Sequence, residues 1–240
     1  MPLDIEKLNI DSEIRDYQLS KVEQEFSKKS STYILGDITA PEDKDLQILL
    51  EEYSNIIFDN IIDALFANLY VEYSSRLTSA AGKAYISNHG AIIRISKMMI
   101  FETFDQLERD IYVNGIKCRT RLHSLMRVLE HELVHVLEYY AFGKTSCKRD
   151  RFRKMAQYLF GHTETTHRLG TMYEIAYQNK KVKPGSKVEF TYRGKRLEGI
   201  VSKITKRATV MSPDKLGQYI DQEKKRYSKF YVPIERLDIL

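Results

Sequence analysis

The sequence predicts an α+β protein in two parts: helices with a small β-hairpin sheet, followed by a small β-barrel. Apolar residues recur every three or four positions over residues 122–142 and again over 152–160, the pattern of helices buried on one face. Residues 75–86 read as extended chain, residues 87–90 as a turn and residues 91–96 as a β-branched strand, which together predict a hairpin. From residue 180 onward, short alternating segments are separated by glycines, which is typical of a small barrel.

The composition is that of a globular protein rather than of a membrane or disulfide-rich one. Hydrophobic residues are 42% and charged residues 30% of the 240 residues, and no apolar run has the length of a membrane span. The acidic N-terminus lacks the basic and apolar regions of a signal peptide. Two cysteines, Cys118 and Cys147, are too few for a disulfide framework. We therefore expect a soluble, cytoplasmic protein that does not contact a membrane.

Charge is divided unevenly along the chain. Residues 1–72 contain six Lys and Arg against sixteen Asp and Glu, a net charge of −10. Residues 180–240 contain sixteen Lys and Arg against seven Asp and Glu, a net charge of +9. A basic end of this kind favours contact with a polyanion, most often a nucleic acid, although a solvated basic surface has the same composition.

The most informative motif is His131-Glu132-Leu133-Val134-His135, inside the predicted helix over residues 122–142. Residues four apart lie on one face of a helix, so His131 and His135 are able to direct two imidazoles at one zinc ion. Glu132 follows the first ligand, where its carboxylate borders the metal and can take a proton from water as the water attacks a carbonyl. The pattern H-E-x-x-H is typical of zinc hydrolases. The alternative is that both histidines are ordinary helix residues.

The N-terminal part gives weaker signals. Residues 1–45 predict a polar extension with a short helix lined by Ile14, Leu19, Val22 and Phe26. A long helical stripe runs from Leu46 to Phe66, residues 97–107 favour a helix, and residues 110–120 read as a connecting loop. The hairpin before the zinc motif is either structural or a strand that pairs with extended substrate.

Several segments together resemble the SprT-like metalloprotease family, whose vertebrate Spartan branch cleaves proteins crosslinked to DNA. The matching segments are residues 76–84, the strand 92–96, the motif 131–135, Phe152 at the head of the next helix, and residues 160–163. They agree in order and spacing over roughly a hundred residues, 74–176. The resemblance implies a zincin-like domain over residues 46–178, with His131 and His135 as zinc ligands and Glu132 as the general base.

The third zinc ligand departs from this family. The family has a histidine four residues before Phe152, where this chain has Lys148, a cation that cannot ligate. His162 is our preferred replacement, since a return helix after the loop would bring it level with His131. Cys147 is the alternative, because a thiolate binds zinc well. His167 and Glu164 are weaker candidates, since their positions are more typical of capping or solvated residues. A further possibility is a degraded, inactive site.

The C-terminal part, residues 180–240, predicts an SH3-like or OB-like barrel that binds nucleic acid. Tyrosines in it are candidates for base stacking or, individually, for the barrel core. Six cations are the candidates for phosphate contacts: Lys203, Lys206, Arg207, Lys225, Arg226 and Lys229.

Taken together, the sequence predicts a Zn²⁺-dependent metalloendopeptidase. By resemblance, its substrate is protein associated with or crosslinked to DNA, and its partner is single-stranded or crosslink-bearing DNA. The alternative is a non-catalytic nucleic-acid-binding protein whose zinc is structural, which requires four protein ligands instead of three and a water. A zinc hydrolase acting on another amide bond is also compatible with the motif.

Overall fold

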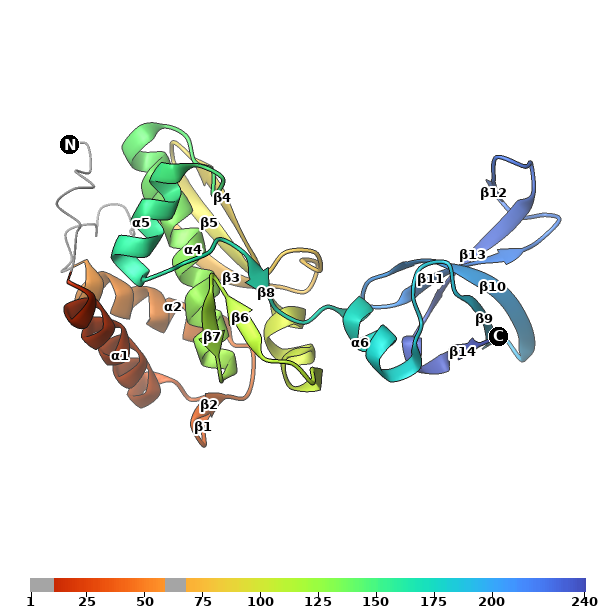
Figure 1. Ribbon diagram of the computed structural model, residues 1–240, viewed down its shortest axis with the longest axis horizontal. Helices are drawn as coiled ribbons and strands as arrows, with labels where there is room; N and C mark the ends of the chain where they lie inside the picture. Colours follow the sequence, from red (N-terminus) through yellow and green to blue (C-terminus); the bar gives the residue numbers. More distant parts are fainter. Residues whose placement is uncertain (1–10, 59–67) are drawn as a thin grey trace. The chain divides into compact units, whose positions relative to one another are not determined.

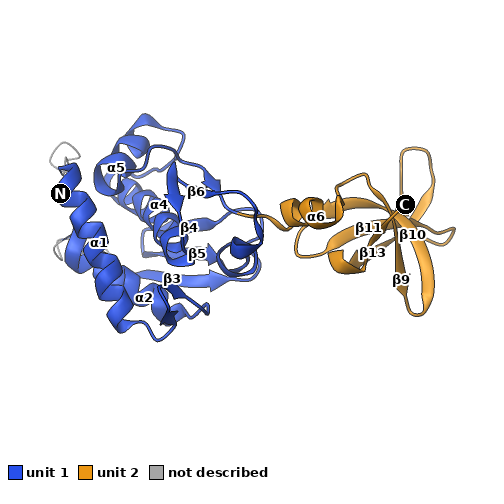
Figure 2. Cartoon of the chain, turned by 60° about the horizontal axis from the view of Figure 1, so that its bottom comes forward, with its two compact units in different colours: residues 1–169 blue, residues 170–240 orange. Residues whose placement is uncertain are grey.

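Helices and small sheets alternate along the chain, which confirms the α+β class (Figure 1). The structure, a computed structural model, describes residues 11–58 and 68–240. Two compact units are present, residues 1–169 (unit 1) and residues 170–240 (unit 2), coloured separately in Figure 2. Among the described residues, no helix combines the length and the apolar character needed to cross a bilayer.

The 22-residue helix α4 (Arg121–Phe142) confirms the helix expected over residues 122–142. Its start is held by Thr120, whose hydroxyl accepts a hydrogen bond from the third helical N–H. The carboxylate of Asp37 accepts hydrogen bonds from the first two N–H groups of the helix. Gly143 ends the helix with a φ of 69°, a conformation that glycine adopts without steric cost.

Other helices pack against this one or against each other. Helix α1 (Ser12–Lys29) buries Leu19, Val22 and Phe26 as expected, whereas Ile14 is 56% exposed. The segment predicted as a polar extension therefore contributes three side chains to the core of unit 1. Helix α2 (Asp43–Glu52) continues as a π-helical segment, Tyr53–Ile57. The remainder of the long stripe predicted to end at Phe66 lies in residues 59–67, outside the described residues.

A three-stranded sheet covers one side of α4 (Figure 1). It contains β3 (Leu69–Ser74), β4 (Gly82–Ser87) and β5 (Gly90–Ser96) in the order β3-β5-β4. The predicted hairpin is β4–β5, and it is antiparallel, whereas β3 runs parallel to β5. Strand β4 is therefore an edge strand, and it packs directly on α4.

A second three-stranded sheet lies where the sequence predicted a connecting loop, and the prediction of a loop over residues 110–120 is wrong. Strands β6 (Ile111–Val113) and β7 (Ile116–Cys118) form a hairpin, and β8 (His167–Arg168) pairs with β6. The turn is Asn114-Gly115, with φ of 54° and 81°. An Asn-Gly pair between apolar residues is a strong hairpin signal, and it explains this turn.

Two further segments complete unit 1. The helix predicted over residues 97–107 is two short turns, the π-helical η3 (Met98–Glu102) and the 3₁₀-helical η4 (Phe104–Gln106). Helix α5 (Asp150–Phe160) confirms the helix expected after the zinc motif and packs on α4.

Unit 2 begins with α6 (Met172–Lys180), a segment that the sequence analysis placed in the catalytic domain. An antiparallel sheet of six strands follows, in the order β12-β13-β11-β10-β9-β14. The strands are β9 (Lys187–Tyr192), β10 (Lys195–Ile204), β11 (Ala208–Pro213), β12 (Tyr219–Ile220), β13 (Arg226–Val232) and β14 (Asp238–Ile239).

No sheet among the described residues closes into a barrel, which corrects the SH3-like or OB-like barrel predicted here. The end strands β12 and β14 have two residues each and pair only with β13 and β9, respectively. Closure requires continuous pairing between the two ends of a sheet, and these end strands are too short to provide it.

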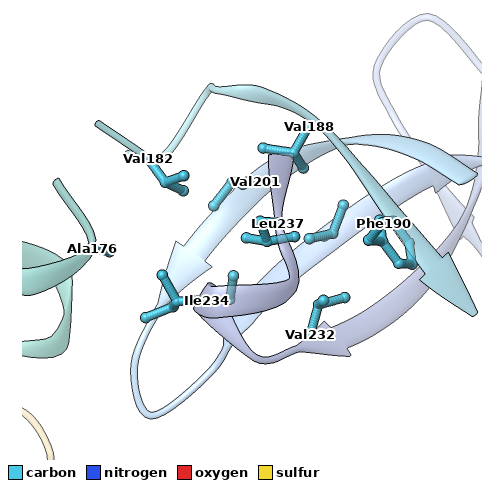
Figure 3. Close-up of a cluster of buried hydrophobic side chains, with 10 residues drawn as sticks. Ala176, Val182, Val188, Phe190, Val201, Val232, Ile234 and Leu237 are labelled. Carbon is cyan, nitrogen blue, oxygen red and sulfur yellow. The ribbon is translucent and has the colours of Figure 1, made fainter. Parts of the chain in front are cut away.

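The core of unit 2 is nevertheless well filled (Figure 3). Ala176 of α6 packs on this core, and so do Ile234 and Leu237 from the segment after β13. The strands contribute Val188, Phe190, Val201, Ala208, Val210 and Val232. Because α6 supplies part of this core, it belongs structurally to unit 2.

Candidate metal centre

Two histidines of α4 lie one turn apart and face a cleft in unit 1. The ring centroids of His131 and His135 are 5.0 Å apart. Phe152 of α5 packs against both rings, with centroid distances of 5.0 and 4.4 Å. This aromatic side chain restricts the imidazoles to a narrow range of orientations, so the helix and its neighbour together fix the pair.

Each imidazole also has a hydrogen-bond partner at Nδ1. The Nδ1 of His131 lies 3.2 Å from Oδ1 of Asn114, and the Nδ1 of His135 lies 2.7 Å from the Thr145 hydroxyl. The amide of Asn114 is oriented by its Nδ2, which donates to the Arg127 carbonyl at 2.7 Å. Because Oδ1 only accepts, Nδ1 of His131 carries the proton and its Nε2 lone pair is free for a metal.

Cys147 completes a set of three ligand atoms. Among the described residues, one atom each from His131, His135 and Cys147 lie within 4.8 Å of one another. The loop that carries Cys147 is anchored by Glu138, a buried residue of α4 that accepts hydrogen bonds from the Ser146 N–H and from Arg151. Two imidazoles and a thiol form a donor set suited to zinc, so the residues present fit the metal.

The structure places His162 outside this cluster. Its Nε2 lies 2.8 Å from Oε2 of Glu130, and the residue is only 3% exposed. Helix α5 does return the chain to the level of the motif, as expected, but on the side of α4 that carries Glu130. The geometry therefore favours Cys147, the alternative in the sequence analysis, over His162 as the third ligand.

Glu130 is the centre of a buried polar network behind the face of α4 that carries the candidate metal ligands. Its carboxylate accepts hydrogen bonds from Arg127 at 2.7 and 2.8 Å and from the Tyr53 hydroxyl at 2.7 Å, in addition to His162. Burial opposes ionisation of Glu130, but Arg127, His162 and Tyr53 together hold its pKa below the ordinary value. The network thus joins α4, α5 and the π-helical segment through one charged group.

Glu132 is buried against the edge strand β4. Burial raises its pKa to about 8, against the opposing effect of a hydrogen bond from the Ala84 backbone. The strand comes this close because Gly82 has no side chain. A Cβ at Gly82 would lie 2.7 Å from Oε1 of Glu132 and 2.8 Å from a methyl group of Val128.

A third histidine lines the same cleft. The cleft has a volume of about 440 Å³ and is bordered by β4, by the motif on α4, and by Thr145, Thr165 and His167. The ring of His167 lies 4.6 Å from that of His131, and its buried Nε2 has no hydrogen-bond partner. Strand pairing of His167 with Val113 holds it there. From sequence, His167 is only a weak candidate for the third zinc ligand, and the structure places it in the cleft.

The six candidate nucleic-acid contacts do not form one cluster. One group, Lys203, Lys206 and Arg207, lies at or next to the turn that joins β10 to β11. A second group, Lys225 and Arg226, lies at the start of β13. Since Ala208 pairs with Val232, the two groups are separated by the length of β13, roughly 20 Å at the usual rise per residue. Lys225 forms an ion pair with Glu223, and Lys229 lies 4.0 Å above the Tyr219 ring.

Comparison with known proteins adds nothing to this geometry. No family model matches the chain, and no curated protein matches it.

Substitution of the candidate ligands should separate Cys147 from His162. In Cys147→Ser we expect zinc affinity to fall by more than about 100-fold, because loss of a ligand exceeds the effect of losing its supporting contacts. In His162→Gln, zinc affinity should stay within a few-fold of the parent protein, since Gln still donates to Glu130. Titration against a competing chelator measures both. Cys118→Ser is the matched thiol control, and zinc loss in His162→Gln alone would contradict the assignment.

Acid should destabilise the metal-free protein through these histidines. Burial, together with neighbouring imidazoles, lowers the pKa of His131 to about 2 and that of His167 to about 4. Below about pH 6.5 the unfolded chain takes up protons that the folded chain does not, so the free energy of unfolding decreases. For His131, the loss between pH 7 and pH 5 is about 2 kcal/mol.

Urea denaturation of the chelator-treated protein at pH 7, 6 and 5 measures this dependence. His131→Gln should reduce the pH dependence by that amount, whereas replacement of the exposed His89 by Gln should leave it unchanged. A parallel pH dependence in the parent protein and in His131→Gln would contradict the prediction.

Proposed function

We propose that this protein is a SprT-like zinc metallopeptidase that hydrolyses peptide bonds. The observation that carries the proposal is the convergence of His131, His135 and Cys147 beside a buried Glu132 in an accessible cleft. Three ligands leave a coordination position for water, whereas a structural zinc takes four protein ligands. The position of His162, on Glu130, supports the three-ligand arrangement.

Zinc bound by these residues would polarise the scissile carbonyl and lower the pKa of its water. A thiolate ligand cancels one of the two zinc charges, which gives the protein base a larger share of the activation. Glu132 would take the proton from the attacking water and deliver it to the leaving amine. Burial raises the pKa of Glu132 in the metal-free protein, and the charge of a bound Zn²⁺ would favour the carboxylate form that accepts the proton.

The edge strand β4 is positioned to bind substrate. It lines the cleft with Gly82, Lys83 and Ala84, and none of the strands described in the structure pairs with its outer edge. An extended peptide that added to this edge would be bound through its backbone, with little demand on its sequence. The unpartnered Nε2 of His167 lines the same cleft, where it would donate a hydrogen bond to the carbonyl oxygen as negative charge develops.

By its resemblance to the SprT-like family, the substrate would be protein associated with or crosslinked to DNA. The basic unit 2 supports this proposal, because attachment to a nucleic acid would bring bound proteins near the cleft. A nucleic-acid-binding protein without peptidase activity is the alternative, and the buried carboxylate beside the metal ligands argues against it.

Glu132→Gln tests the catalytic assignment. We expect the variant to retain zinc, because Glu132 is not a ligand, and to lose casein cleavage by about 10²- to 10⁴-fold. Cleavage is measured on gels with added zinc, with and without single-stranded DNA, and Glu51→Gln on the exposed surface of α2 is the control. Equal cleavage by Glu132→Gln and the parent protein would overturn the assignment.

His167→Ala tests the role of the third histidine. We expect kcat to fall by about 100-fold, the usual cost of losing one donor to a developing oxyanion, with KM and zinc content nearly unchanged. Steady-state kinetics on a fluorogenic peptide and metal analysis give these quantities, with His89→Ala as the control. Loss of zinc in His167→Ala would make it a ligand instead, and unchanged kcat would exclude both roles.

A further inference from the structure

The sheet of unit 2 has an open seam between β9 and β13. These strands are the fifth and second in the sheet order, and no strand pairing joins them across the seam in unit 2, all of which is described. Aromatic rings meet there instead. Phe230 of β13 lies 5.3 Å from Phe190 and 5.0 Å from Tyr192, both on β9, measured between ring centroids.

Three hollows follow one another along the seam. The central one, of about 310 Å³, contains Tyr192, Phe230 and Tyr231 together with Arg207 and Arg236. A second hollow, of about 480 Å³, shares Phe190, Thr191 and Arg236 with the central one. A third, of about 350 Å³, shares Phe230 and Tyr231 with it. The shared lining residues place the three hollows next to one another, and we refer to them together as the track. Each hollow has room for a nucleotide base.

Aromatic surface along this track is accessible. Tyr231 is 64% exposed, Tyr192 45% and Tyr219 41%, although tyrosine side chains in a folded unit usually bury their rings. Phe230 forms part of the floor between them. Successive exposed rings at the lips of a track are the arrangement on which unpaired bases stack.

The charge along the track favours a polyanion. Its lining contains five cations, Arg193, Arg196, Arg207, Lys229 and Arg236, and two acids, Glu189 and Asp238. Arg196 is paired with Glu189, and Asp238 lies 3.9 Å from Lys180. Arg207 and Arg236 are exposed beside the central hollow, and neither has an acidic partner among the described residues.

We infer that the open seam of unit 2 is a binding track for single-stranded nucleic acid, in which bases stack on Tyr192 and Tyr231 while Arg207 and Arg236 contact phosphates. Paired bases of a duplex are stacked on each other and do not reach the hollows, so the seam selects unpaired strands. This inference rests on the nucleic-acid part of the proposed function and specifies where the strand binds. It places the binding site at the seam instead of at the six cations predicted from sequence. Of those six, only Arg207 and Lys229 line the track.

Fluorescence anisotropy tests the inference with the full-length Glu132→Gln protein, which prevents degradation during the measurement. The probes are labelled dT20, U20 and a 20-base-pair duplex. We expect binding to dT20 or U20 that is at least tenfold tighter than to the duplex and that weakens steeply with salt. The relative affinity for dT20 and U20 identifies the preferred sugar.

Variants locate the site. Tyr231→Ala and Tyr192→Ala should each weaken binding by about tenfold, because each removes a ring on which a base stacks. The double variant Arg207→Gln, Arg236→Gln should weaken binding and also reduce its dependence on salt concentration, because it removes phosphate contacts. Tyr231→Phe should keep most of the affinity, because the ring that stacks is retained. Matched controls are Tyr173→Ala and Lys183→Gln, at exposed positions outside the track. Thermal denaturation checks that each variant folds.

Three results would overturn the inference. They are equal binding of the duplex, unchanged affinity in the folded Tyr231→Ala and Tyr192→Ala variants, and displacement of dT20 by poly-glutamate at equal charge concentration. Casein cleavage without nucleic acid is measured separately on the active forms of the same variants and should be unchanged. Absence of cleavage in the parent protein would count against the peptidase proposal alone, while the binding result would stand.

Discussion

Helix α4 points three successive side chains in three directions, and this geometry constrains the rest of unit 1. Neighbouring residues of an α-helix are about 100° apart around its axis. Glu130 therefore faces His162, just after α5, and the π-helical segment, while His131 faces the cleft and Glu132 faces β4. Each polar group needs a partner once it is buried, so the helix must be surrounded by elements that supply one. Arg127 supplies a partner to Glu130, the Asn114 turn supplies one to His131, and the Ala84 backbone of β4 supplies one to Glu132.

The second constraint is the distance at which β4 approaches the helix. Gly82 lies where any side chain would meet Glu132 and Val128, so the position of the carboxylate and that of the edge strand depend on each other. Phe152 has the corresponding role on the opposite side, where its ring contacts both imidazoles. The face of α4 that carries the candidate metal ligands is thus confined between the closely approaching strand β4 and the ring of Phe152.

Hydrophobic periodicity and turn residues predict those helices and hairpins whose formation depends on neighbouring residues in the sequence. The helix of the motif, its successor α5 and the β4–β5 hairpin follow from periodicity and turn residues, and the structure has all three. The hairpin β6–β7 was missed, although its Asn-Gly turn carried the signal. Local patterns do not decide whether Cys147 or His162 is the third candidate ligand, because the answer depends on which face of α4 the segment after α5 meets. The partners of the imidazole Nδ1 atoms, Asn114 and Thr145, likewise come from segments distant in sequence or from an irregular loop.

In unit 2, the alternating strands were recognised, but closure of the sheet depends on the lengths of β12 and β14, which hydrophobic alternation does not determine.

The free edge of β4 has a consequence for what the cleft admits. A peptide segment pairs with such an edge only when its own backbone N–H and C=O groups are not already hydrogen-bonded. In folded domains most of these groups are paired. The cleft would therefore act on segments that are already unfolded or have been pulled free, and the folded state of a target would protect it. The same edge would accept a segment from another copy of this chain. Its short length, the glycine at its start and the exposed Lys83 and Ser87 on it all weaken that self-association.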